Sequence, residues 1–186
     1  YDVSKIGLRA VGTDGMDGRI DRIVELGCSK LSSDTFQCML KYQRAILRGE
    51  SHQSSVLLDL AVQAAMQEDH WYPRQVVGVA CESAGSWKHA MDIWRLMEEG
   101  VAPTDHVSRS IYAAARAQEW AYVLERCRQH RKNGGSSRGF LLTEVQALLT
   151  IREPMQAFEL ATEWCDQHQD DKERTLLRVT AAIHAH

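Results

Sequence analysis

Residues 84–97 read Ala-Gly-Ser-Trp-Lys-His-Ala-Met-Asp-Ile-Trp-Arg-Leu-Met, and this stretch decides the fold because the chain repeats its pattern. The pattern returns as Ala-Gln-Glu-Trp-Ala-Tyr-Val-Leu in residues 117–124 and as Ile-Arg-Glu-Pro-Met-Gln-Ala-Phe-Glu-Leu in residues 151–160. One place in the unit is held by Ala90, Val123 and Ala157, at spacings of 33 and 34 residues. A period of about this length is typical of stacked helix pairs, in which no pair buries its apolar face alone. We therefore predict a helical-repeat protein that offers a binding surface.

The composition fits one folded, helical domain over residues 1–186, because 44% of the residues are hydrophobic and 25% are charged. Apolar runs such as 76–81 are far shorter than the roughly 20 residues that cross a bilayer, so we expect no membrane insertion. Five scattered cysteines are typical of buried free thiols in a reducing compartment. A net charge of −3 does not attract polyanions, so any contact with RNA needs a local basic patch.

Apolar residues recur at helical spacing along most of the chain. Val107, Ile111 and Ala114 follow the i, i+4, i+7 pattern, and a second amphipathic segment begins at Trp120. The same arrangement predicts further helix pairs on both sides of this one. The approximate units are 1–30, 31–68, 69–104, 105–136 and 137–169, followed by a terminal helix over 170–186.

Residues 84–103, which end in Gly-Val-Ala-Pro at 100–103, resemble the pentatricopeptide repeat. Units of this family read approximately Ala-Gly-x-Trp/Leu-x-x-Ala-Leu-x-Leu-Phe-x-x-Met-x-x-x-Gly-Val-x-Pro-Asp. Tetratricopeptide repeats are near relatives, but the Gly-Val-Ala-Pro link favours the pentatricopeptide family. The resemblance implies an all-α fold, a right-handed α-solenoid of about five helix-turn-helix repeats. It is close in one unit, moderate in the next two, and limited to helical period before residue 69.

Pentatricopeptide proteins generally bind single-stranded RNA, often in mitochondria or plastids, with one base for each unit. By register, the resemblance places the reading position of the first helix near Gln75 and Ser108, and the position at the unit end near Thr104. The third unit departs from the pattern, because Leu142 cannot exchange hydrogen bonds with a base edge. Gln75 and Ser108 also fit as solvated residues at the start of a helix.

Basic residues are concentrated in one run, which leaves a helix and enters a Gly-Gly loop. Its five fixed cations are Arg126, Arg128, Arg131, Lys132 and Arg138. These side chains are candidates for contact with RNA phosphates, which give affinity without sequence specificity. An ordinary helix end is the alternative, because cations complement the helix dipole at its C-terminus and Gly-Gly after Asn133 is a common helix stop.

The sequence offers little support for catalysis, cofactors or metals. Cys127 and His130 could share a helix face, but no second Cys/His pair stands at the spacing of a structural zinc site. No nucleophile elbow, metalloprotease motif or phosphate-binding loop is found. The tryptophans stand at helical core positions, where we expect packing between pairs, and Trp71 is also a candidate for base stacking.

Two functions fit these observations. The first is a non-enzymatic RNA-binding or scaffold subunit of an organellar ribonucleoprotein, such as the mitochondrial ribosome or an RNA-processing complex. Its partners would be single-stranded or ribosomal RNA and other protein subunits. The second is a protein-protein interaction scaffold without direct RNA contact, which the acidic balance and Leu142 favour.

Overall fold

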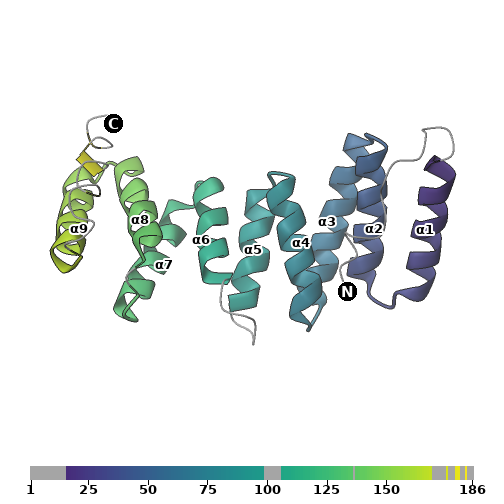
Figure 1. Cartoon of the computed structure of the whole chain (residues 1–186), viewed down its shortest axis with the longest axis horizontal. Coiled ribbons are helices and arrows are strands. Elements are labelled where there is room, and N and C mark those ends of the chain that lie inside the picture. The colour runs from purple at the N-terminus through teal and green to yellow at the C-terminus, as the bar shows by residue number, and fades with distance from the viewer. Residues whose placement is uncertain are drawn as a thin grey trace. The chain divides into compact units, whose positions relative to one another are not determined.

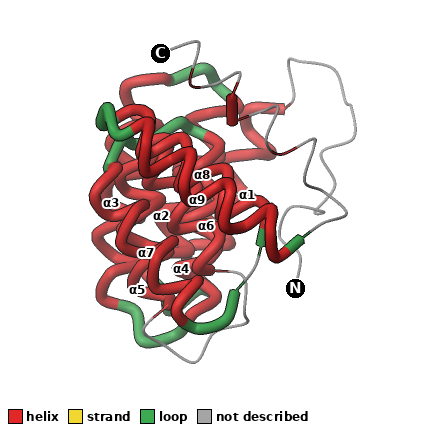
Figure 2. The backbone as a smooth tube through the Cα atoms, turned by 90° about the vertical axis from the view of Figure 1, so that its left-hand side faces the viewer, coloured by secondary structure: helices red, strands yellow, loops and turns green. Residues whose placement is uncertain are grey.

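The computed structural model describes residues 16–98, 106–135 and 137–168, together with residues 175, 179, 180 and 183. Within these residues the chain is helical and contains no strand, which confirms the expected all-α class (Figure 2). The helices are α1 (Met16–Lys30), α2 (Asp34–Leu47), α3 (Ser51–Gln67), α4 (Trp71–Ser83), α5 (Trp87–Glu98), α6 (His106–Arg116), α7 (Trp120–Lys132), α8 (Arg138–Thr150) and α9 (Pro154–Gln167), labelled in Figure 1. Thr104 and most of the expected terminal helix lie outside the described residues.

The chain divides into two compact units between Pro73 and Arg74. In the first unit, α1 contacts α2 and α2 contacts α3. In the second unit, each helix from α5 to α9 contacts the next one along the chain. This succession of neighbouring helices is the repeat-like arrangement that the 34-residue period predicts. None of the described helices combines the length and the apolar character of a bilayer span.

The turn inside each helix pair is the most regular part of the repeat. One residue of each turn adopts left-handed backbone geometry, with φ between +63° and +72°: Gly49, Gly85, Gln118 and Arg152. The next amide donates to the carbonyl oxygen five residues back, in the bonds Glu50 to Ala45, Ser86 to Cys81, Glu119 to Ala114 and Glu153 to Leu148, all 2.8–2.9 Å. The amide of the left-handed residue itself donates to the carbonyl oxygen three residues back, at 3.0–3.2 Å. The two bonds together form a Schellman motif, which satisfies carbonyls at a helix end.

The four turns extend the repeat to α2 and α3, where the sequence showed only helical period. They also align the buried positions of the second helices. Ala90, Val123 and Ala157 each follow a left-handed residue by five positions, and each is 0% exposed. The shared place predicted from the sequence is therefore a shared place in the core.

A close approach between α4 and α5 depends on a small residue. A Cβ atom added at Gly78 would lie 2.7 Å from the ring of Trp94, which is 0% exposed. The indole N–H of Trp94 donates to the Glu82 carboxylate at 2.8 Å, so a hydrogen bond to α4 orients the ring beside Gly78.

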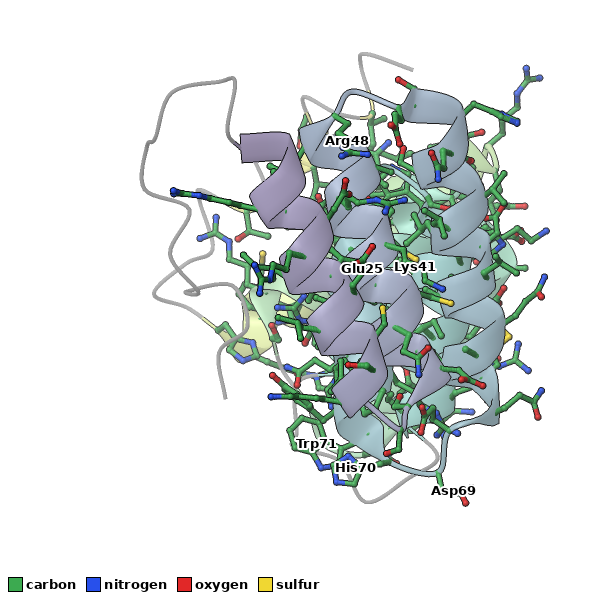
Figure 3. All side chains as sticks on the ribbon, turned by 90° about the vertical axis from the view of Figure 1, so that its right-hand side faces the viewer. Glu25, Lys41, Arg48, Asp69, His70 and Trp71 are labelled. Atoms are coloured by element: carbon green, nitrogen blue, oxygen red, sulfur yellow. The ribbon has the colours of Figure 1, made fainter. Side chains whose placement is uncertain are left out.

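Some large apolar residues at helical spacing are exposed, although such spacing is typical of core positions. Ile23, Leu60, Val79 and Phe158 are 41–53% exposed, because each lies on the face of its helix that no described neighbour covers. The expectation that all five tryptophans are core residues was also too broad: Trp94 and Trp164 are buried, and the other three are half-buried. Trp71 lies with His70 at one end of the helices of the first unit (Figure 3), where the two rings stack at 5.8 Å.

Candidate nucleic-acid interface

The basic run occupies the last turns of α7 and the link to α8. Gly134 ends α7 in left-handed geometry (φ +81°), its amide donates to the Arg131 carbonyl at 2.9 Å, and the Gly135 amide donates to the His130 carbonyl at 3.0 Å. This is the helix stop that the sequence predicts after Asn133. A methyl group at Gly135 would collide with the ring of His130, so the chain turns tightly against that ring.

A cleft of about 500 Å³ opens beside this turn, between the end of α7, the start of α8 and the end of α9. Its lining contains three of the predicted phosphate ligands, Arg128, Arg131 and Lys132. His130 and Phe140 also line the cleft, and their rings stack with centroids 4.1 Å apart. The structure thus gathers fixed cations and aromatic rings in one concave site.

Arg131 is also part of an internal ion pair. Its Nε and Nη2 atoms donate to the two carboxylate oxygens of Glu144 at 3.0 and 2.8 Å, and Arg128 Nε lies 4.0 Å from the nearer oxygen. Glu144 is 2% exposed, so this bidentate pair supplies the partner that a buried carboxylate requires. Arg131 is therefore a structural cation as well as a lining residue, and the five cations of the run are not equivalent.

Arg126 has a second internal partner. Its guanidinium pairs with Glu98, whose side chain is 6% exposed and also accepts hydrogen bonds from Ser110 and Tyr122. These contacts join α5, α6 and α7. Arg126 does not line the cleft, and its main contact holds the helices together.

The remaining predicted residues lie elsewhere in the second unit. Gln75 is half-buried on α4, Ser108 is exposed on α6, and Leu142 is half-buried on α8. Arg138, the first residue of α8, is half-buried. None of these four residues lines the cleft.

Sequence reasoning missed the carboxylates that balance the arginines. A signal existed for Glu144, because it stands between Leu141, Val145 and Leu148 on an apolar helix face, where an acid must find a buried partner. Its partner could not be identified, since four arginines lie in the same run. No comparable signal marked Trp164, which lines the cleft and stacks on His168 at 4.2 Å.

Cys127 lies in this region, and its thiol has low reactivity. Burial, reinforced by the negative charge of Glu144, raises the pKa of the Cys127 thiol to about 12, although Arg131 acts in the opposite direction. A thiol with this pKa is protonated at neutral pH and is a poor nucleophile or metal ligand. Among the described residues, no group of three His, Cys, Asp or Glu side chains is arranged to hold a metal ion.

Comparisons with family models, with curated proteins and with solved structures give no match to this chain. The support for the candidate interface therefore comes from the sequence and the geometry of this chain alone.

Proposed function

We propose that this chain is a non-enzymatic, pentatricopeptide-like right-handed α-solenoid that binds single-stranded RNA. In this proposal it is a small RNA-binding or scaffold subunit of an organellar ribonucleoprotein, such as the mitochondrial ribosome or an RNA-processing complex. The mitochondrial location comes from the family resemblance in residues 84–103. The Schellman turns at Gly49, Gly85, Gln118 and Arg152 support the repeat architecture because they recur at steps of 36, 33 and 34 residues.

The observation that carries the RNA proposal is the cationic cleft. Arg128 is 47% exposed and Lys132 is exposed, so both can neutralise phosphates without first leaving a buried site. Aromatic rings in the same cleft provide stacking surfaces, which single-stranded RNA uses and a duplex does not. The net charge of the whole chain is negative, so local attraction by this cleft is the relevant effect.

The test is the affinity for a fluorescent single-stranded RNA, measured over a range of salt concentrations. Arg128→Gln combined with Lys132→Gln removes two lining cations and leaves the Arg131–Glu144 pair intact. The matched control is Lys88→Gln with Arg95→Gln, which removes the same charge from exposed positions on α5.

We expect the cleft variant to weaken binding and to reduce the salt slope by about 0.7 for each phosphate that the protein no longer neutralises. The control should bind like the wild type. Equal weakening in both variants would mean that net charge alone is responsible, and absence of RNA binding at low salt would refute the proposal.

The second candidate is a protein-protein interaction scaffold. It is favoured by large apolar side chains that the first unit exposes: Ile23 and Leu26 on α1, and Val56 and Leu60 on α3, at 45–53%. A partner that covers these side chains would remove apolar area from water. The test is protein crosslinking in the native complex with photoreactive residues at positions 56 and 60. Crosslinks to a protein subunit, together with RNA binding that is insensitive to the cleft variant, would favour this candidate.

A further inference from the structure

The cleft at the end of α7 is large enough to hold a small ligand. Its volume of about 500 Å³ falls within the roughly 300–1,000 Å³ typical of pockets that enclose small molecules. Such pockets combine apolar or aromatic walls with a few polar groups, and this one combines Phe140 and Trp164 with Arg128 and Lys132. Further polar groups come from Ser137 and Gln167.

The charges of the lining indicate an anionic ligand. Arg128, Arg131 and Lys132 face two carboxylates, the lining residue Glu163 and the Arg131 partner Glu144, which leaves one net positive charge. A smaller hollow of about 220 Å³ also borders Arg128 and Arg131, but three carboxylates line it, from Glu144, Glu159 and Glu163. Of these two hollows, the larger cleft therefore suits a phosphate.

The aromatic wall indicates a planar group attached to that phosphate. His130 and Phe140 already stack on each other, and both are only half-buried. A nucleobase can extend such a stack, because every base has a π-face. A simple inorganic anion would leave this wall unused.

We propose that the cleft is a pocket for a single nucleotide, with the phosphate on Arg128 and Lys132 and the base against the His130–Phe140 stack. This inference deepens the proposed RNA contact, on which it rests, by assigning one nucleotide of the strand to a defined pocket. The side chains of Ser137 and Gln167 supply hydrogen bonds to the sugar or the base edge.

The test is titration of the full chain with adenosine 5′-monophosphate, adenosine and inorganic phosphate by calorimetry. We expect saturable binding of the monophosphate, at least tenfold tighter than either fragment. Lys132→Gln should weaken it about five- to tenfold and Phe140→Leu about tenfold, whereas Lys88→Gln should have no effect. Far-UV circular dichroism checks that Phe140→Leu retains the helices.

A second measurement needs no variant. In amide NMR spectra of the wild type, the monophosphate should shift signals of residues 128–140 and 160–167 and leave α1 to α3 unchanged. Absence of saturable binding, shifts confined to other regions, or equal affinity for inorganic phosphate would each overturn the nucleotide pocket.

The two proposals fail separately. If the monophosphate does not bind but RNA binding is still sensitive to Arg128 and Lys132, the pocket is refuted and the RNA interface stands. If the monophosphate binds and RNA does not, the RNA proposal is refuted and a site for free nucleotides stands.

Discussion

At the scale of single residues, Glu144 is the acidic residue with the least exposed side chain among those that the structure describes. It is 2% exposed and its charge is matched by the bidentate guanidinium of Arg131. We predict that Arg131→Ala lowers the free energy of unfolding by about 3 kcal/mol, because it leaves a buried carboxylate with Arg128 only at 4.0 Å. Lys132→Ala, one residue along and exposed, should change it by less than about 0.5 kcal/mol.

Urea unfolding of both variants at neutral pH measures the difference. The variant Arg131→Ala/Glu144→Leu is the informative companion, since it removes both charges and should recover much of the stability. Equal stability of the two single variants would show that the Arg131–Glu144 pair contributes nothing.

Cys127 gives a prediction about pH. Its folded-state pKa of about 12 lies above the ordinary value of 9.0, so the protonated thiol is favoured by folding. The stability it contributes is fully present below pH 9 and is lost as the pH rises from 9 through 12. We expect Cys127→Ala to show a weaker loss of stability over this interval than the wild type, measured by urea unfolding at several pH values.

Thiol labelling provides an independent check. At about pH 8, just below the ordinary thiol pKa, the half-buried Cys28 and Cys38 should react with iodoacetamide, Cys38 slowly because burial raises its pKa. The buried Cys81, Cys127 and Cys165 should react only in urea. Mass spectrometry of the labelled peptides separates the two classes of cysteine. Rapid labelling of Cys127 in the native protein would contradict its buried position.

At the scale of elements, the turns between paired helices recur along the chain. In two of them the left-handed position is held by a residue other than glycine. Gln118 and Arg152 have positive φ, where a side chain costs roughly 1 kcal/mol that glycine avoids. We predict that Arg152→Gly raises the free energy of unfolding by between about 0 and 1 kcal/mol. The gain is limited because glycine also increases the conformational entropy of the unfolded chain. Gly85→Ala, at the matching place in another turn, should destabilise by about 1 kcal/mol.

Thermal unfolding measures both changes. We expect Gly85→Ala to lower the melting temperature and Arg152→Gly to leave it unchanged or raise it. If Gly85→Ala were stabilising, the left-handed geometry at that turn would be wrong.

Most helices were predictable because their apolar spacing and their turn residues agree. Gly85-Ser86 and Pro154 mark helix boundaries locally, and the structure ends α4 at Ser83 and begins α9 at Pro154. The α2–α3 turn was less visible, because a 36-residue step from Gly49 to Gly85 interrupts the 33- and 34-residue steps that follow. Exposure of Leu60 and Val79 was not predictable, since periodicity identifies an apolar face without saying which neighbour covers it.

At the scale of the whole molecule, the candidate site was only partly predictable. A basic run is visible in sequence, and Arg128, Arg131 and Lys132 do line one cleft. Which arginines serve internal carboxylates depends on contacts between different helices, such as that of Arg126 on α7 with Glu98 on α5. Phe140 and Trp164 join the cleft from α8 and α9, so their contribution required the packed structure.

The division between Pro73 and Arg74 leads to a last prediction, about independent folding. Three ion pairs that join helices of the second unit are complete within it: Glu82–Arg109, Glu98–Arg126 and Arg131–Glu144. We therefore expect a fragment of residues 70–186 to fold alone, with a helical circular dichroism spectrum and one cooperative urea transition.

A matched fragment, residues 87–186, lacks α4 and with it both Gly78 and the Glu82 carboxylate that accepts the Trp94 N–H bond. Its α5 would expose the buried ring of Trp94, so we expect a lower urea midpoint than for residues 70–186. If residues 70–186 gave a noncooperative transition, the second unit would depend on the first for its stability. Equal midpoints for the two fragments would instead mean that the contact of α4 with Trp94 adds little to stability, although it includes the hydrogen bond to Glu82.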